Sequence, residues 1–564
     1  MSRTTHTDSK PAETTWEISA ARKRDDRANR LKPYAHWSLA ELTPPPSHNN
    51  VIPLVHARLT DRERSFLASD VTDLAQRLAT RECTALEVTT AFCKAAYAAQ
   101  ELTNCLTEVM FEQALGRAQE LDEHISTSGK VIGPLHGVPI SIKDNIAVKG
   151  EDTATGFVAW AGRTIAEEDA TVVRILRQAG AIIYVKTTNP QALGAVETLS
   201  NIYGRTTNPF NRSLGCGGST GGEGALIASR GSLLGVGTDI GSSIFGLTSS
   251  SSLTYSHTLG VIRVPSAWCG IYGLKPSSDR LPASGLLSPY QGLDNTPVVT
   301  GPMAHSARDL ELFCRVISDY EPWTSDFSTL PIPWNSSLAQ HRESDKLLIG
   351  IFTDDGVVAP HPPVIERLQK TREALIAAGH EVIDWVPMDH MKGFELGIKL
   401  LLPDGGEAIR TVLAESGEPA IPPVARLLNN YKEGGGHTLA ESWAVNSKSG
   451  RPVDAVLCPA AATLAPPPNT TSWIGYTSYW NLLDLPAVVF PSGKPLQASS
   501  WASASRSSDD QPRNPMEELA RAQWNPEAFD GAPVGLQLVG RRWQEEKLLA
   551  VLKHVEDAVA RFEK

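Results

Sequence analysis

Cysteine is scarce in this chain of 564 residues, and the seven cysteines include neither a CxxC pair nor any spacing typical of a metal site. Such a sparse, odd count argues against a disulfide framework and favours a reducing compartment. Long apolar runs are also missing: no stretch of about 18 apolar residues occurs that could form a membrane-spanning helix. No apolar run of roughly 7–15 residues follows the first methionine, so we expect no signal peptide and a cytoplasmic location.

An excess of basic charge is missing as well. The chain has 52 Lys and Arg against 63 Asp and Glu, which gives a net charge of −11. This balance argues against nucleic acid and against anionic membranes as partners. The remaining composition is that of an ordinary globular enzyme, with 41% hydrophobic and 20% charged residues. We therefore expect a small-molecule substrate, with no metal and no other cofactor.

The chain divides at about residue 60. Residues 1–60 are polar, partly basic and rich in proline, and they predict an extended surface arm or a disordered tail. Over 61–564, helical patterns alternate with short apolar runs, which predicts an α/β fold: one large α/β/α sandwich on a mixed β-sheet. Predicted helices cover about 84–100, 111–125, 170–178, 364–378 and 544–562, and predicted strands cover 138–142, 181–185, 347–352, 453–458, 487–490 and 534–539.

The most unusual stretch runs from Gly215 to Ser277 and begins with a run of glycine, serine and threonine, Gly217 to Gly222. Such a run excludes a stable helix or a packed strand. It suits backbone that approaches a reacting group, with N–H donors directed into a cavity. A second small cluster, Gly241 to Ser243, ends an apolar run. Two loops that bear hydroxyl groups predict a nucleophile and a group that activates it.

A lysine supplies the third element. The strand-like segment 138–142 ends at Lys143, and a lysine in that position can enter the interior, where burial lowers its pKa so that it acts as a base. Serine–lysine pairs are known variants of the catalytic triad. Lys186 also ends an apolar run and His136 adjoins a glycine turn, but we interpret both as structural. The glycine-rich run could be a plain loop; a nucleotide-binding turn would need a Gly-Lys-Ser/Thr sequence, which is absent.

Several segments together resemble the amidase signature family, and most of all its fungal acetamidase and general amidase branch. The resemblance runs from about residue 60 to the C-terminus, with the signature core at about 133–277. It implies the amidase signature fold and hydrolysis of a linear carboxylic amide to the acid and ammonia or an amine, without a cofactor. The segments that carry it are PISIKD (139–144), CGGSTGGEGA (216–225), GTDIGSSI (237–244), RVPSAWCGIYGLKPS (263–277) and WNLLDLP (480–486).

Matched residue by residue, the resemblance implies a Ser-Ser-Lys triad. Lys143 becomes the base, Ser219 the bridging serine in a cis peptide, and Ser243 the nucleophile that forms an acyl-enzyme. The expected oxyanion and substrate-binding groups are the backbone N–H groups of Ile240, Gly241, Ser242 and Ser243, together with Ser219.

The chain departs from the family pattern directly after the expected nucleophile. In the family, Ser-Ile is followed at once by Arg, whereas here the segment 245–262 separates Ile244 from Arg263. Removing that segment restores the pattern with Ser243 as nucleophile. A second register pairs residues 260–263 with Gly-Ser-Ile-Arg and puts Val261 in the place of the nucleophile. We prefer Ser243 because it is contiguous with the preceding Thr-Asp-Ile-Gly.

Two alternatives stay open. The inserted segment 245–262, together with a helical region at 440–453 that is shorter than in the family, is consistent with a mis-spliced chain. Such a chain would be a catalytically impaired protein of the amidase fold that retains only ligand binding. A glutamine amidotransferase-type subunit is the second alternative, and it would require a partner subunit. Without such a partner, we expect either a monomer or a homodimer.

Overall fold

The computed structural model describes residues 15–42, 49–240, 261–290, 297–340, 345–402, 404–430, 453–501 and 511–564. The predicted site residues Gly241, Ser242 and Ser243, and the inserted segment as far as residue 260, lie outside these ranges. The strands are β1 (Leu106–Val109), β2 (Pro139–Lys143), β3 (Ile182–Thr187), β4 (Leu199–Ser200), β5 (Gly204–Arg205), β6 (Leu234–Ile240), β7 (Tyr272–Lys275), β8 (Val298–Ala304), β9 (Leu348–Ile351), β10 (Glu381–Asp384), β11 (Ala455–Pro459), β12 (Ala487–Pro491) and β13 (Gly535–Val539).

Helices fill most of the remaining chain. Up to the middle of the chain they are α1 (Thr15–Leu31), η1 (Lys32–Trp37), α2 (Ile52–Val55), α3 (Asp61–Ala68), α4 (Val71–Ala79), α5 (Ala85–Thr103), α6 (Phe111–Ser128), α7 (Thr171–Gln178), η2 (Gln191–Leu193), α8 (Gly221–Ala228) and α9 (Arg263–Trp268). They continue with α10 (Ala307–Asp319), η3 (Pro322–Thr324), α11 (Pro362–Ala377), α12 (His390–Leu401), α13 (Glu407–Ser416), α14 (Pro422–Asn430), α15 (Gly475–Leu482), η5 (Ala498–Ser500), α16 (Pro515–Gln523) and α17 (Glu545–Phe562).

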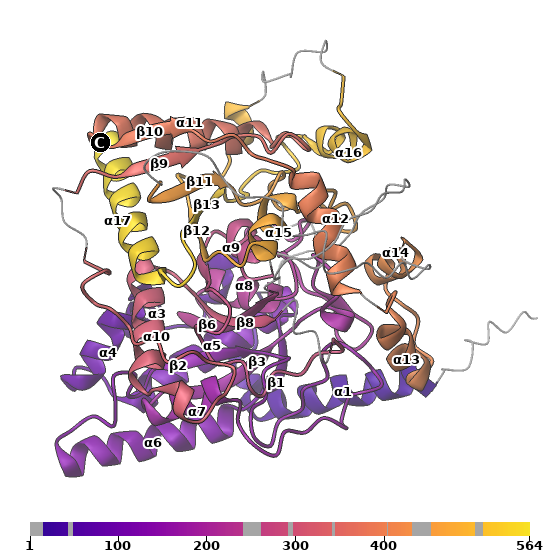
Figure 1. Cartoon of the computed structure of the whole chain (residues 1–564). Helices are drawn as coiled ribbons and strands as arrows, with labels where there is room; N and C mark the ends of the chain where they lie inside the picture. Colours follow the sequence, from indigo (N-terminus) through magenta and orange to yellow (C-terminus); the bar gives the residue numbers. More distant parts are fainter. Residues whose placement is uncertain are drawn as a thin grey trace, which may run out of the picture.

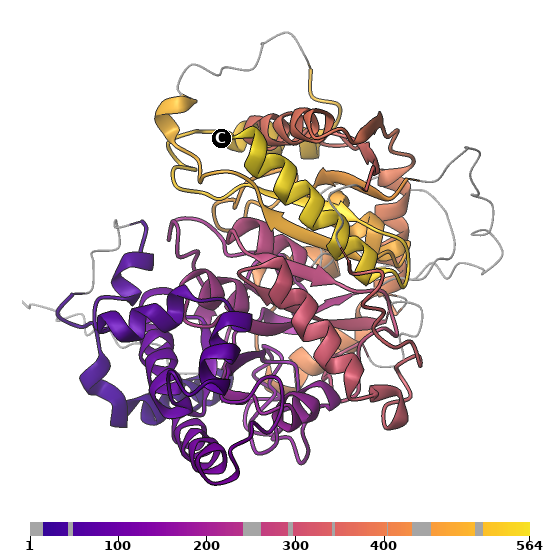
Figure 2. The ribbon, with the colours of Figure 1, turned by 90° about the vertical axis from the view of Figure 1, so that its left-hand side faces the viewer.

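Eleven of the strands form one mixed sheet in the order β1-β3-β2-β6-β8-β7-β12-β13-β11-β9-β10 (Figure 1). Helices α8 and α9 pack against its central strands, and α10 and α17 lie together along the sheet in Figure 2. The predicted α/β fold on a mixed sheet is therefore confirmed. The predicted helix after Thr84 is also present, and the Thr84 and Glu87 side chains form a capping box at the start of α5.

The strands that lead to the predicted site lie in the middle of one half of the sheet. Every residue of β2, β3 and β6 is buried, as expected for apolar strands covered on both faces. These three strands run parallel, so their C-terminal residues, Lys143, Thr187 and Ile240, lie at the same edge of the sheet. In α/β folds, ligands commonly bind outside this carboxyl edge.

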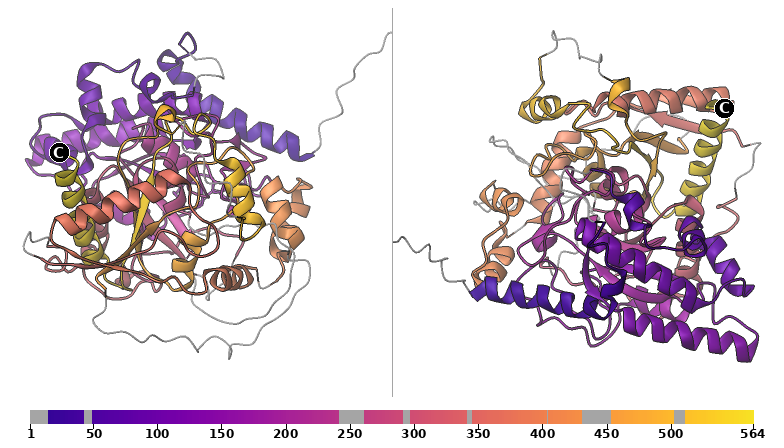
Figure 3. Two further views of the ribbon diagram at one scale, coloured as in Figure 1. Left: turned by 90° about the horizontal axis from the view of Figure 1, so that it is seen from above. Right: turned by 180° about the vertical axis from the view of Figure 1, so that it is seen from behind.

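The N-terminal arm is helical where it is described, and not extended. Helix α1 lies beside β1, at the edge of the molecule (Figures 1 and 3). Its Lys23 is buried, with Nζ 2.7 Å from a carboxylate oxygen of Glu108 and 3.1 Å from one of Asp152. On the same helix, Ala20 is buried in a small apolar cluster. Composition did not reveal this helix because its stability comes from partners that are distant in sequence.

We expect Lys23→Met to destabilise the protein by about 3–5 kcal/mol, because the change leaves two buried carboxylates without their shared cation. The variant keeps most of the aliphatic stem, so the loss reports on the charge. The measurement is the free energy of unfolding in urea. Arg22→Met, at an exposed position of the same helix, is the control and should change stability by less than about 0.5 kcal/mol. Equal stability of the two variants would contradict the prediction.

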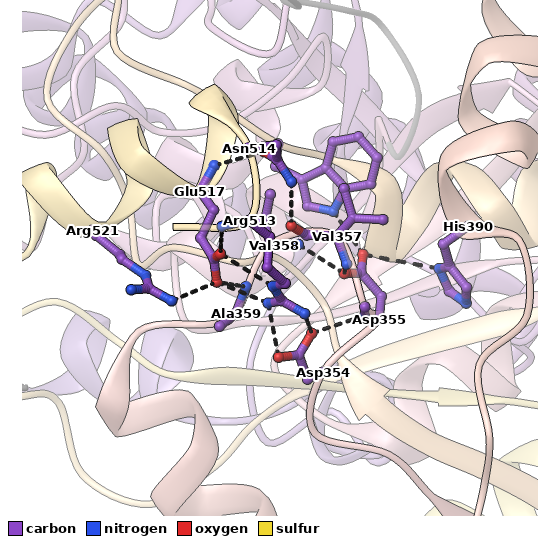
Figure 4. A network of polar contacts seen from close by, with 12 residues as sticks. Asp354, Asp355, Val357, Val358, Ala359, His390, Arg513, Asn514, Glu517 and Arg521 are labelled. Carbon is purple, nitrogen blue, oxygen red and sulfur yellow. Dashed lines mark hydrogen bonds and ion pairs between the residues drawn. The ribbon is translucent and has the colours of Figure 1, made fainter. Parts of the chain in front are cut away.

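Helix α16 and the residues directly before it are anchored to the loop after β9 (Figure 4). The Arg513 guanidinium donates to both carboxylate oxygens of Asp354, at 3.0 and 2.9 Å, and also to Glu517. Burial opposes the ionisation of Glu517, but Arg513 and the Ala359 N–H hold the pKa of this carboxyl at about 2. The anchor is therefore charged at neutral pH.

Within the described part of the chain, no helix is both long and apolar enough to cross a membrane.

Candidate active site

Lys143 ends β2 and is fully buried between β3 and β6. Its Nζ donates to Ser219 Oγ at 2.7 Å and to Thr238 Oγ1 at 2.7 Å. The structure thus brings together two residues that the sequence placed in one site, although 76 positions separate them. Thr238 was not predicted; its hydroxyl also lies 3.4 Å from the Asn145 side-chain oxygen.

The environment of Lys143 favours the neutral amine. Burial lowers the pKa of Lys143 well below its usual value, and the attraction of the nearby carboxyl groups of Asp239, Asp144 and Glu223 offsets only part of this effect. Both hydrogen bonds described above go to hydroxyl groups, so neither of them stabilises an ammonium ion as a carboxylate would. A neutral lysine in contact with a serine hydroxyl can accept its proton.

The loop that carries Ser219 differs from its prediction in two ways. The glycine-rich run was expected to contain no helix, yet α8 begins at Gly221. Close packing explains the glycines, because a Cβ on Gly222 would lie 2.4 Å from the backbone nitrogen of Thr188. The bridging serine was expected in a cis peptide, but the described residues contain no cis bond. At a non-proline residue, a trans peptide bond is more stable than a cis bond by about 2.5–4 kcal/mol. Ser219 contacts Lys143 without a cis bond.

Glu223 connects helix α8 to strands β2 and β3. It accepts hydrogen bonds from Ser141 Oγ at 2.5 Å and from Thr187 Oγ1 at 2.9 Å. Burial raises the pKa of Glu223 to about 8, and the two hydroxyl donors counter only part of that effect. Glu223 therefore contributes little negative charge near Lys143 at neutral pH, which again favours the neutral amine.

Of the four predicted oxyanion residues, Ile240 is described. It is the last residue of β6, where it pairs in register with Val298 of β8. It lies two positions after Thr238, which contacts Lys143. The end of β6 and the Lys143–Ser219 pair therefore belong to one buried region. Gly241, Ser242 and Ser243 follow Ile240 directly in the sequence and lie outside the described residues.

A charged group that was not predicted adjoins this region. Asp239 and Arg263 are both fully buried and form an ion pair of 3.3 Å. Burial opposes ionisation of Asp239, but Arg263 holds the pKa of this carboxyl below its usual value. Asn481 of α15 donates to the same carboxylate at 2.8 Å. All three residues occur in motifs that carry the family resemblance, yet nothing in the sequence indicates that they meet.

The described chain resumes at Val261 and Ile262, the last two residues of the inserted segment. The Ile262 side chain is fully buried, and its N–H donates to Asp239 at 3.0 Å. The Val261 Cα lies 3.7 Å from the position that a Cβ on Gly218 would occupy. Val261 therefore packs against the glycine-rich loop, beside Ser219.

The two rejected candidates, Lys186 and His136, have other hydrogen-bond partners. Lys186 is buried and donates to the Asp152 carbonyl at 2.7 Å and to Thr153 Oγ1 at 3.0 Å. His136 accepts a hydrogen bond at Nδ1 from the Ile132 N–H at 3.2 Å. Neither of these contacts involves a serine. Across the described ranges, no group of three or more His, Cys, Asp or Glu side chains could hold a metal ion.

A buried lysine in contact with a serine hydroxyl is a known variant of the catalytic triad of hydrolases. The sequence profile of the Amidase family matches residues 87–245 and 256–549, and the chain belongs to this family. It is thus a hydrolase that acts on amides. The unmatched residues 246–255 fall within the inserted segment, which is consistent with an interruption of the family pattern at that point.

Relatives and solved structures agree with this assignment. The chain is 37% identical over 565 residues to an acetamidase of Emericella nidulans, with 96% of this chain and 97% of the relative covered. It is 38% identical over 504 residues to a putative amidase of Schizosaccharomyces pombe, covering 86% and 88% of the two chains. Among solved structures, a fatty acid amide hydrolase superposes with a TM-score of 0.85 and 30% identity, over 96% of this chain and 95% of that one.

Proposed function

We propose that this protein hydrolyses a carboxylic amide through a triad of Lys143, Ser219 and Ser243 and a covalent acyl-enzyme. The observation that carries the proposal is the 2.7 Å contact between Lys143 Nζ and Ser219 Oγ in a fully buried site. Burial lowers the pKa of Lys143, so the amine is available as a base. Ser243 completes the triad through its match to the family motif, three residues after Ile240 at the end of β6.

The reaction follows from these roles. Lys143 takes the proton of Ser219, which in turn takes the proton of Ser243, and the resulting alkoxide attacks the amide carbon. Backbone N–H groups of residues 240–243 stabilise the oxyanion; the loss of one such donor typically costs about 10²–10³ in rate. The lysine then returns its proton through Ser219 to the leaving nitrogen, so the C–N bond breaks and ammonia or an amine departs. Water hydrolyses the acyl-enzyme and restores Ser243.

We further propose a small aliphatic amide as substrate. The support is the similarity to acetamidases of Emericella nidulans and Aspergillus oryzae, each 37% identical to this chain. The test is a panel of linear amides of increasing acyl length, with release of ammonia or amine as the readout. A larger kcat/KM on acetamide than on long-chain amides is expected, and the reverse order would contradict this substrate class.

The scarcity of cysteine supports a cytoplasmic location, and the net charge of −11 supports a small-molecule partner over nucleic acid or a membrane. For the oligomeric state, we propose a monomer or a homodimer, which sedimentation velocity distinguishes.

A second candidate is a protein of the same fold with impaired catalysis. The packing of Val261 beside Gly218 and Ser219 favours it, because two residues before Arg263 is the position of the nucleophile in the family pattern. A valine there offers no hydroxyl group. In this second hypothesis, the inserted segment displaces Ser243 from the position that it needs to attack the substrate.

Deletion of residues 245–262 distinguishes the two candidates. It joins Ile244 to Arg263, so Ile244 takes the buried position of Ile262 and Ser243 takes that of Val261. If the insertion impairs catalysis, we expect kcat/KM to rise by about 10²-fold over the full chain, since a displacement of about 1 Å can cost that much. Val261→Ser in the full chain is a companion variant that offers a hydroxyl at the same position. Equal or lower activity after the deletion would make the segment a working part of the site.

A further inference from the structure

The end of β6 is held by a side chain from a distant part of the chain. Asn481, on α15, is fully buried. Its amide nitrogen donates to Asp239 Oδ1 at 2.8 Å and also to the carbonyl oxygen of Ile240. Its amide oxygen accepts a hydrogen bond from Arg263. One side chain thus contacts the last two residues of β6 and the first residue of α9.

The same group also binds the end of the inserted segment and the start of α9. Asp239 Oδ2 accepts the N–H of Ile262 at 3.0 Å and faces the Arg263 guanidinium at 3.3 Å. Arg263 is held in turn by the Thr477 carbonyl at 3.0 Å and by Gln537 Oε1 at 3.1 Å. Ile240, directly before 241–260, and Ile262, two residues after it, are therefore both bonded to the group formed by Asp239, Arg263 and Asn481.

We infer that Asn481 is a positioning residue for amide hydrolysis: its amide fixes the end of β6 and, through Asp239, the start of α9. This inference rests on the proposed function, in which the nucleophile lies within the segment that begins after Ile240. Asn481 acts through the backbone and touches none of the reacting atoms.

The physical basis is that these polar groups lie where water does not replace a lost partner. Removing Asn481 takes one donor from the Ile240 carbonyl and one from Asp239 Oδ1, which keeps its 3.4 Å contact with Arg263. It also takes an acceptor from Arg263, and losing hydrogen bonds among buried groups is costly. A shift of β6 would let these groups form new hydrogen bonds. Such a shift moves Thr238, one residue before Asp239, whose hydroxyl accepts a hydrogen bond from Lys143. The site would therefore lose alignment at the base as well as at the end of the strand.

The experiment compares Asn481→Leu with Asn211→Leu in the full chain. Asn211 is a matched control: it is buried, and its amide donates to two backbone carbonyls, of Ala528 and Asp530, at 3.4 and 3.2 Å. Both variants remove a buried amide of the same size. They differ in that Asn481 contacts the end of β6 and Asn211 does not.

Two readouts separate positioning from general stability. Hydrogen–deuterium exchange should rise by about tenfold in peptides from 234–240 and 261–268 in Asn481→Leu only. With an amide substrate, kcat should fall by about 10²-fold for the same variant, with KM changed by less than about threefold. If Asn481→Leu and Asn211→Leu show the same exchange in these two peptides, the inference is overturned, whatever the activity. If Asn481→Leu does not fold, Asn481→Ser replaces it in the experiment. We then expect the same changes in exchange and in kcat, but smaller ones.

The role of Asn481 and the proposed triad can fail independently of each other. If Ser243→Ala retains full turnover, the triad is wrong, yet exchange still reports whether Asn481 holds the two flanks. If Ser243→Ala is inactive while Asn481→Leu keeps wild-type kcat, the triad stands and the positioning role of Asn481 is overturned.

Discussion

Ser243→Ala is expected to abolish amide hydrolysis while the protein remains folded. The alanine cannot form an acyl-enzyme, and what remains is catalysis by the oxyanion donors and by binding alone. In serine hydrolases, the loss of the nucleophile reduces kcat by about 10⁶-fold. We therefore expect turnover of a simple amide to fall below detection. The melting temperature should change little, because the change removes a single hydroxyl group.

The measurement is kcat/KM on one linear amide, made in the full chain and in the chain lacking 245–262. In the full chain, Ser252→Ala is the matched control, a serine-to-alanine change in the inserted segment, outside the residues that match the family profile. It should keep the activity of the parent protein. Wild-type turnover in Ser243→Ala would show that another group attacks the substrate, and the assignment of the nucleophile would be wrong.

Lys143→Met should have the second largest effect, a loss of about 10³–10⁴-fold in kcat/KM. General-base catalysis commonly contributes about 10²–10⁴, and here the same residue also returns the proton to the leaving nitrogen. Methionine keeps much of the buried stem, so the variant tests the amine and not the packing. Ser219 loses the amine whose Nζ lies 2.7 Å from its Oγ.

The pH dependence gives an independent test of the same residue. A base must be neutral to work, so activity should fall as the pH drops through the pKa of Lys143. Burial lowers that pKa well below its usual value of 10.5, so activity should be high at neutral pH and should decline on the acid side. A profile of kcat/KM for the parent protein that stays flat down to about pH 5 would argue against a neutral lysine base.

Lys186→Met is the control for the lysine experiments. Lys186 is also fully buried and its pKa is also lowered by burial, but it donates to Asp152 and Thr153. Its loss should reduce stability and leave the acid limb of the pH profile in place. If the decline of activity in acid disappears in both methionine variants, it cannot be assigned to Lys143. The assignment of the base to Lys143 would then fail.

Much of the fold was predictable from local patterns. The faces of α4 and the capping box of α5 depend on residues three or four positions apart, and the structure has both. The buried strands β2 and β3 follow from short apolar runs. The start of α8 was missed, because the glycines of its first turn are poor helix formers. Close packing of that turn against Thr188 requires them, and neighbours across a fold are not visible in a local pattern.

The sequence by itself determined the family, the sheet-and-helix architecture and the pairing of Lys143 with Ser219, because each depends on contiguous motifs. The tertiary structure alone decided which charged side chains are buried and with what partners. Lys23 fixes a helix through Glu108 and Asp152, and Asn481 reaches Asp239 across 242 positions. A buried ion pair or amide is stable only where a partner is supplied. That partner comes from the packing of distant segments, which local sequence patterns do not encode.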